Sequence, residues 1–128
     1  MASRWRKVGL ANGKTKLKMP KNIGSKSKVK GSYKFELSGD SVPYPKKKGK
    51  TLYIGGTNNL YNRLMNQHLK GRNSSASLQA YLKSKKRVYL WIKIAKGNAS
   101  DKLLEKRERE KHISEYGMIP ICDKQEKK

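Results

Sequence analysis

Hydrophobic and polar residues alternate along residues 33–37, which is the period of a half-buried β-strand. Two further short stretches, residues 51–54 and 87–94, are runs rich in hydrophobic residues and are also expected to be strands. The third is the richest in β-branched and aromatic side chains, so it is expected to be the central strand. Residues 38–50 separate the first two with Gly, Asp, two Pro and a basic tip, and Gly55-Gly56 is expected to end the second strand. The pattern predicts a hairpin with a long, positive loop.

Three other segments follow the 3.6-residue period of an amphipathic helix. A helix is expected over about residues 59–70, a short one around residues 78–82, and a longer one from residues 98–101 to Tyr116, where Gly117 supplies the stop. The order of elements is then β-β-α-α-β-α. This order predicts an α+β domain in which helices flank a small central antiparallel sheet.

The two ends of the chain differ in composition from its middle. Residues 1–30 hold ten Lys or Arg and no acid, a composition that does not fold alone, so they are expected to form a basic arm, extended or partly disordered. Two readings stay open for this arm: Trp5, Val8 and Leu10 pin part of it to the domain, or it is a tail that tolerates deletion. Residues 31–123 are expected to form one domain, and residues 124–128 a charged tail.

The charge balance points to a polyanionic partner. The chain of 128 residues has 32 Lys and Arg against 9 Asp and Glu, a net charge of +23, which favours nucleic acid over a lysine-rich surface kept for solubility. No apolar run approaches a membrane-spanning length, so a membrane partner is not expected. The basic residues expected to contact nucleic acid are Lys46, Lys47, Lys48, Lys50, Lys70, Arg72, Lys83, Lys85 and Lys86.

The single cysteine and the N-terminal residues bear on the compartment. Cys122 stands alone, so one chain builds neither a disulfide nor a cysteine-based zinc site, and an intracellular, reducing compartment is expected. No apolar segment of the secretory type follows the first basic residues. A nuclear or organellar address stays open.

The residues around the second strand carry the candidate chemistry. Tyr53-Ile-Gly55 is followed ten residues later by Arg63 and fifteen residues later by His68, and Gly31-Ser-Tyr33 precedes it. Arg63 borders the apolar face of its predicted helix, where a guanidinium can reach a phosphate. The alternative reading makes Tyr33 and Tyr53 half-buried packing residues of a sheet, and His68 a helix-end residue near the negative pole of the dipole.

With these residues in place, the segment 31–123 resembles the GIY-YIG nuclease family, as a small stand-alone member. The resemblance implies a GIY-YIG-like fold and a metal-dependent endonuclease that cuts DNA. It also implies catalytic roles for Tyr33, Tyr53, Arg63 and His68, together with a glutamate between residues 105 and 110 that holds one divalent ion. Gly31, Ile54 and Gly55 match the structural motif. Two positions depart from the family pattern, Ser32 where isoleucine is usual and Asp123 where an asparagine is common.

The choice of the metal ligand depends on the phase of the last helix. With Leu103 and Ile113 taken as inward markers, Glu110 falls on the buried edge and is expected to be the catalytic metal ligand, with Glu108 as second choice. A single carboxylate suits Mg²⁺ or Mn²⁺, which keep water ligands, and zinc is not expected.

Two non-catalytic functions remain as alternatives. One is a basic nucleic-acid-binding or ribosome-associated protein that binds RNA with this fold, and the other is a DNA-compacting protein. The size leaves no room for a separate recognition domain, so specificity would come from the arm, the loop, a homodimer or a partner protein.

Overall fold

The computed structural model describes residues 5–12, 23, 29–68, 76–84, 86–95 and 101–123. Four antiparallel strands form its main sheet in the order β1-β6-β2-β5, and two very short strands form a separate hairpin. The main strands are β1 (Arg6–Leu10), β2 (Gly31–Ser38), β5 (Thr51–Thr57) and β6 (Arg87–Ile94); the hairpin consists of β3 (Val42–Pro43) and β4 (Lys48–Gly49). The expected α+β class with a central antiparallel sheet is confirmed.

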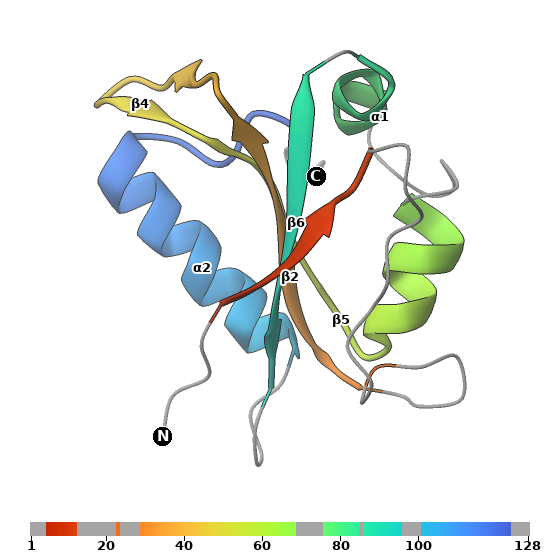
Figure 1. Ribbon diagram of the computed structural model, residues 1–128. Helices are drawn as coiled ribbons and strands as arrows, with labels where there is room; N and C mark the ends of the chain where they lie inside the picture. The colour runs from red at the N-terminus through yellow and green to blue at the C-terminus, as the bar shows by residue number, and fades with distance from the viewer. Residues whose placement is uncertain are drawn as a thin grey trace.

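Helices cover both faces of this sheet (Figure 1). The helix α2 (Asp101–Tyr116) packs on one face against β2 and β5, whereas the short helix η1 (Asn62–Gln67) and α1 (Ala76–Lys83) lie on the other. The described helices are all too short or too polar to cross a membrane. The expected sequence of three helical segments is therefore present.

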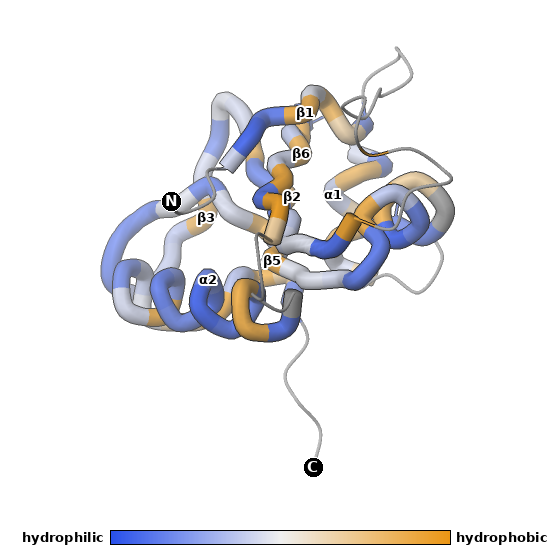
Figure 2. The backbone as a smooth tube through the Cα atoms, turned by 90° about the horizontal axis from the view of Figure 1, so that it is seen from below, coloured by the Kyte–Doolittle hydropathy of each residue, from blue (hydrophilic) through white to orange (hydrophobic). Residues whose placement is uncertain are grey.

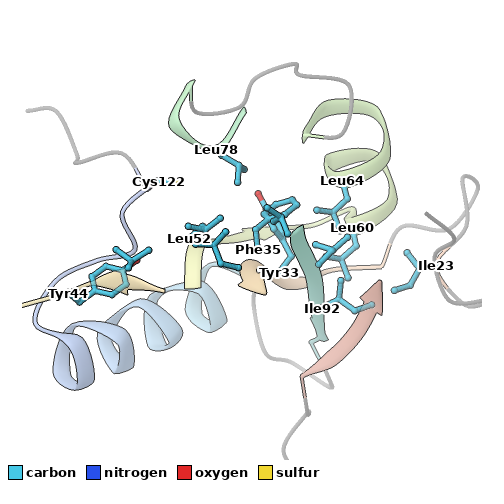
Figure 3. Close-up of a cluster of buried hydrophobic side chains, with 14 residues drawn as sticks. Ile23, Tyr33, Phe35, Tyr44, Leu52, Leu60, Leu64, Leu78, Ile92 and Cys122 are labelled. Atoms are coloured by element: carbon cyan, nitrogen blue, oxygen red, sulfur yellow. The ribbon is translucent and has the colours of Figure 1, made fainter. Parts of the chain in front are cut away.

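The hydrophobic core lies mainly between the sheet and the helices η1 and α1 (Figure 3). Alternate side chains of β2 point to this face, and β6 places its apolar residues opposite them. Helices η1 and α1 close the layer with fully buried leucines. The central members of the core are Tyr33, Phe35, Leu37, Leu60, Leu64, Leu78, Val88, Leu90 and Ile92.

Part of the expected basic arm belongs to the sheet. Residues Arg6–Leu10 form β1 and pair with β6, with a register shift between Lys7 and Gly9. Val8 packs against the core. The arm composition did not show this strand because its stability comes from pairing with residues of β6, far away along the chain. Much of the remaining arm lies outside the described residues.

The strand β5 continues through Gly55-Gly56, so the expectation that these glycines end it was wrong. Gly55 pairs with Tyr33 of β2. A Cβ atom on Gly55 would lie 2.4 Å from Oη of Tyr33, so the glycine leaves room for that ring to cross the neighbouring strand. The pair of glycines is a site of close packing within the sheet.

The expected phase of α2 was also wrong. Leu103 and Ile113 are 42% and 43% exposed, whereas Glu108 and His112 are buried. The sheet-facing side of α2 is polar, and Figure 2 shows the helix as largely hydrophilic. The end of the helix is as expected: Gly117 has φ +95° and its N–H donates to the carbonyl of Ile113 at 2.8 Å.

Candidate active site

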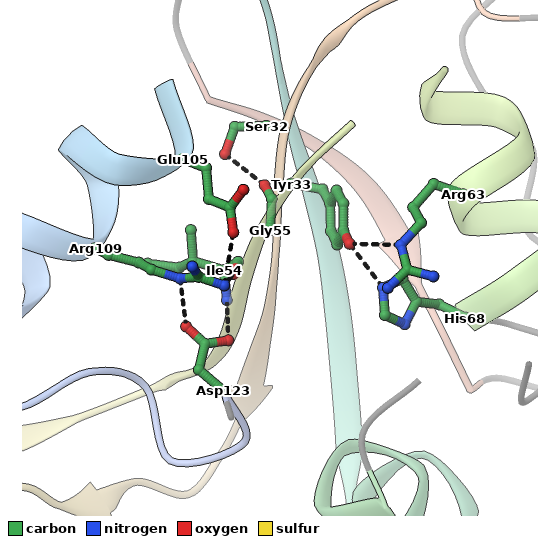
Figure 4. A network of polar contacts seen from close by, with 9 residues as sticks. All are labelled: Ser32, Tyr33, Ile54, Gly55, Arg63, His68, Glu105, Arg109 and Asp123. Carbon is green, nitrogen blue, oxygen red and sulfur yellow. Dashed lines mark hydrogen bonds and ion pairs between the residues drawn. The ribbon is translucent and has the colours of Figure 1, made fainter. Parts of the chain in front are cut away.

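The hydroxyl group of Tyr33 joins strand β2 to helix η1. It lies 2.7 Å from Nε2 of His68, and Nε of Arg63 donates a hydrogen bond to it at 3.2 Å (Figure 4). Arg63 also hydrogen-bonds Gln67 through Nη1. Tyr33 and His68 are fully buried, and Arg63 is half-buried. The structure thus brings together three of the expected catalytic residues.

The winding of η1 explains how two residues of one helix reach the same hydroxyl. The N–H of His68 points to the carbonyls of both Arg63 and Leu64, so the backbone makes the wider turn of a π-helix. A π-helix closes i→i+5 bonds, and residues five apart therefore lie on one side of it. An ordinary α-helix would turn His68 away from Arg63.

Burial keeps His68 neutral in this cluster. Desolvation, assisted by the positive charge of Arg63, lowers the pKa of His68 to about 3. Burial also raises the pKa of Tyr33 above its usual range. Because Arg63 donates to the Tyr33 oxygen, the Tyr33 proton is available to a neutral Nε2 of His68. In the tautomer of His68 whose Nε2 carries no proton, the hydrogen bonds run from Arg63 to Tyr33 and from Tyr33 to His68.

Tyr53 lies beside this cluster on β5 and is more open. Its ring stacks on that of Tyr33 with the ring centroids 6.0 Å apart, and the centroid of the His68 ring lies 5.2 Å from that of Tyr53. Burial raises the pKa of Tyr53, as does the negative charge of Asp123, while Arg63 opposes the shift. Tyr33 and Tyr53 therefore share one sheet face with Arg63. Tyr53 is the half-exposed member of the pair.

A second polar cluster lies on the α2 side of β5 (Figure 4). Asp123 accepts a hydrogen bond from the backbone N–H of Ile54 at 3.1 Å and pairs with Nε of Arg109 at 3.0 Å. Arg109 also donates to the carbonyl of Ile54 at 3.1 Å and pairs with Glu105 at 2.7 Å. Together these side chains fix the edge strand beside Tyr53.

Both departures from the family pattern have partners in the structure. The Asp123 carboxylate fills the acceptor role expected at its position; its burial raises the pKa to about 7, while the charge of Arg109 acts in the opposite direction. Ser32 is buried and its hydroxyl donates to the carbonyl of Gly55 at 2.8 Å. Each residue thus tethers β5.

The carboxylates of α2 differ in their suitability for a divalent ion. Glu110, the expected ligand, is exposed on the side of α2 turned away from the sheet. Glu108 is held by the Trp5 indole at 3.3 Å and by Lys93 at 2.7 Å. Among the described residues there is no group of three His, Cys, Asp or Glu side chains that would hold a metal.

Glu105 fits a divalent ion better than the two expected glutamates. It lies on the sheet-facing side of α2 beside β5, and its side chain is 21% exposed. Its partner Arg109 keeps two other acceptors, Asp123 and the Ile54 carbonyl, when Glu105 turns to a cation. One such carboxylate with water ligands suits Mg²⁺ or Mn²⁺.

The basic residues expected to contact nucleic acid fall into two groups. In the first, Lys47 pairs with Glu115 at 2.8 Å and Lys46 binds the carbonyl of Ser114 at 2.9 Å, so part of the loop is tied to the end of α2. Lys48 and Lys50 are exposed. In the second group, Lys83 is exposed and Lys86 pairs with Asp40. The remaining three, Lys70, Arg72 and Lys85, lie outside the described residues.

The comparison with protein families agrees with this geometry. Residues 45–115 match the GIY-YIG catalytic domain. The chain belongs to the GIY-YIG family. It is thus a member of a nuclease family whose proteins generally use divalent metals, and whose substrates are nucleic acids. Comparisons with curated proteins and with solved structures found no match. Tyr33 and Asp123 of this GIY-YIG protein lie outside the matched residues, and the structure joins them to the matched segment through His68 and Ile54.

The sequence did not predict the contacts of Arg109 and Gln67, and within the expected range of residues 105–110 it did not select Glu105. The four-residue spacings of Glu105 with Arg109 and of Arg63 with Gln67 are typical of helical side-chain pairs. In a chain this rich in Lys and Arg, such spacings recur widely, and they do not single out the pairs that face β5.

Proposed function

We propose that this GIY-YIG protein is an endonuclease that hydrolyses phosphodiester bonds in DNA with Mg²⁺ or Mn²⁺. The observation that carries the proposal is the hydrogen-bonded set of Arg63, Tyr33 and His68 with Tyr53 stacked beside it. A half-buried arginine, two tyrosines and a neutral histidine supply a phosphate contact and a path for a proton.

In this proposal Tyr53 is the hydroxyl nearest to the attacking water, since it is the more exposed tyrosine. Tyr33 and His68 act behind it: Tyr33 orients the site, and His68 receives a proton at Nε2, which lies 2.7 Å from the Tyr33 hydroxyl and is unprotonated in the neutral ring. The approach of a negatively charged phosphate raises the proton affinity of His68, which the positive charge of Arg63 otherwise lowers.

Arg63 is proposed to stabilise the negative charge that develops on the phosphate. On the other side of β5, Glu105 is the residue proposed to hold the ion. Such an ion would neutralise phosphate charge and lower the pKa of a bound water. Tyr53 is within electrostatic reach of both Arg63 and Asp123, so a substrate that crosses the edge of β5 meets both clusters.

The test is nicking of supercoiled plasmid with and without Mg²⁺ or Mn²⁺, with branched DNA and RNA as further substrates. Arg63→Ala and Glu105→Gln are each expected to lower the rate by about two orders of magnitude and to leave DNA affinity nearly intact. Glu110→Gln is the matched control on the same helix and is expected to cut like the wild type. Full activity of Arg63→Ala would refute the proposed site.

A second candidate function is non-catalytic binding of nucleic acid, including RNA on the ribosome. The pairing of Glu105 with Arg109 favours it, because an arginine lies where an ion would bind. This function predicts tight binding without cleavage under any metal condition. If cleavage of both strands is observed, we propose a homodimer or a partner protein, and the concentration dependence of linear product formation tests this.

A further inference from the structure

Aromatic and lysine side chains alternate in a row on the sheet face opposite Tyr33. Lys7 of β1 and Lys34 of β2 are the neighbours of Trp91 on β6, on its two sides. Residues paired across strands point to the same face, and the pairing of Ile92 with Tyr33 places the other face beneath η1. The aromatic–lysine row comprises, in spatial order, Tyr89, Lys7, Trp91, Lys34, Trp5 and Lys93.

The contacts in this row are close. The Lys7 ammonium lies 3.7 Å from the centroid of the Tyr89 ring and 5.7 Å from that of Trp91. Lys34 lies 4.5 Å from the Trp5 ring and 5.5 Å from Trp91. These are cation–π distances. Along the row, an aromatic ring and a lysine ammonium group therefore follow each other in turn.

The row is accessible at the β1 end. The helix α2 packs on β2 and β5, while Tyr89 and Trp91 stay half-exposed on β6. Lys7 is exposed, and among the described residues it has aromatic partners but no carboxylate partner. By contrast, the inner lysines are neutralised: Lys93 pairs with Glu108 and Lys34 lies 3.9 Å from Glu36.

We propose that the aromatic–lysine row is a binding site for single-stranded nucleic acid, whose unpaired bases stack on Tyr89 and Trp91 while Lys7 contacts the phosphates. Bases stack on aromatic side chains irrespective of sequence, and a positive groove follows the backbone. A duplex hides its base faces, so it offers this row only phosphates. The flexible stem of Lys7 lets its ammonium leave the Tyr89 ring for a phosphate.

The sheet separates this site from Tyr33, Arg63 and His68, and Glu105, which lies on the same face as the row, is beside β5 at the opposite edge of the sheet from β1. Such a site predicts that the protein holds a single-stranded segment on one face while the other face carries the cluster that defines the proposed nuclease. Binding here does not depend on cleavage and is therefore measured in EDTA.

The two tryptophans of the chain, Trp5 and Trp91, both belong to the row, so intrinsic tryptophan fluorescence reports on it alone. The full chain is titrated with oligo-dT, with oligo-U, and with inorganic polyphosphate of equal charge. Both oligonucleotides are expected to quench the fluorescence several-fold more strongly than polyphosphate, because stacking requires bases. The ratio of the two oligonucleotide affinities tells whether DNA or RNA is preferred.

Anisotropy of fluorescein-labelled oligo-dT gives affinities for variants. Tyr89→Leu is expected to bind at least about 5-fold more weakly, the lower end of the loss of one stacked base, while Tyr89→Phe binds like the wild type. Lys7→Gln is expected to reduce the slope of log affinity against log salt by about 0.7. Lys106→Gln, on the exposed side of α2, is the matched control, and it is expected to leave the quenching of tryptophan fluorescence by the oligonucleotides nearly unchanged. Oligonucleotide binding without tryptophan quenching, or wild-type affinity of a folded Tyr89→Leu, would overturn the proposal.

Discussion

Gly55 is the position where the smallest change should have the largest effect on the site. Its backbone passes under the Tyr33 ring, and a Cβ atom there would lie 2.4 Å from both Cζ and Oη of that ring. Carbon atoms in contact are normally about 3.5–4.0 Å apart. In Gly55→Ala the ring must therefore move by roughly 1 Å or more, and His68 and Phe35 pack against it on other sides.

Two costs add up in this variant. Overpacking of a dense core costs about 1–3 kcal/mol. Breaking the buried hydrogen bond between Tyr33 and His68 adds about 1–3 kcal/mol. The free energy of unfolding should fall by roughly 2–6 kcal/mol, which at about 4 °C per kcal/mol lowers Tm by roughly 8 °C or more. If the protein is a nuclease, plasmid nicking well below Tm should also fall.

Gly49→Ala is the matched control. A Cβ atom on Gly49 would lie 2.7 Å from Cε1 of the Tyr116 ring, which is far from the Tyr33 hydroxyl in the sheet and half-exposed. This variant should lose stability and keep its specific activity. A more direct check introduces Gly55→Ala into a protein that already carries Tyr33→Leu. The side chain at position 33 then has no Cζ or Oη atom, so Gly55→Ala should lower the free energy of unfolding by less than about 1 kcal/mol. Additive losses of Tm, or a wild-type Tm for Gly55→Ala, would refute this account of the glycine.

Three further predictions concern titration and the first strand. Because the pKa of His68 is lowered to about 3, the unfolded chain takes up a proton on this histidine before the folded protein does, and the free energy of unfolding should fall as the pH drops from 6.5 toward 3. The C2 proton of His68 should show no titration by NMR between pH 5 and 8, unlike that of a solvent-exposed histidine. The pH dependence due to Asp123 runs in the opposite direction, because its pKa is raised to about 7. The free energy of unfolding should fall by up to about 4 kcal/mol as the pH rises from 4 to 7, and denaturant melts of Asp123→Asn should lack this decline. Deleting residues 1–12 removes β1 and should lower Tm and weaken DNA binding in anisotropy titrations; an unchanged Tm would show that β1 adds nothing to the sheet.

The sequence predicted the elements whose signals are local. Alternation and aromatic content located β2, β5 and β6, and capping residues located the end of α2 at Gly117. The spacing from Tyr53 to Arg63 and His68 identified three side chains that do meet on one face of the sheet.

Features that depend on distant partners were not predictable in the same way. The strand β1 lies in a lysine-rich segment and is stabilised by β6, and the sheet-facing side of α2 is polar because Glu108 and Arg109 find partners on other elements. Because Leu103 and Ile113 are apolar, the hydrophobic pattern predicts that they face inward, and this gave the wrong phase for helix α2. The spacing of hydrophobic residues likewise does not reveal the wide turn of η1, although this turn decides where His68 points.

The way β5 is fixed also limits how copies of this chain can associate. An edge strand normally exposes free N–H and C=O groups that another strand can pair with. On β5 the Ile54 N–H and carbonyl are occupied by Asp123 and Arg109, and the Leu52 carbonyl accepts from the N–H of Cys122 at 2.8 Å. The sheet is thereby closed to lengthening from this side. Two copies that met on this side of the sheet would therefore do so through side chains and not by pairing their β5 strands.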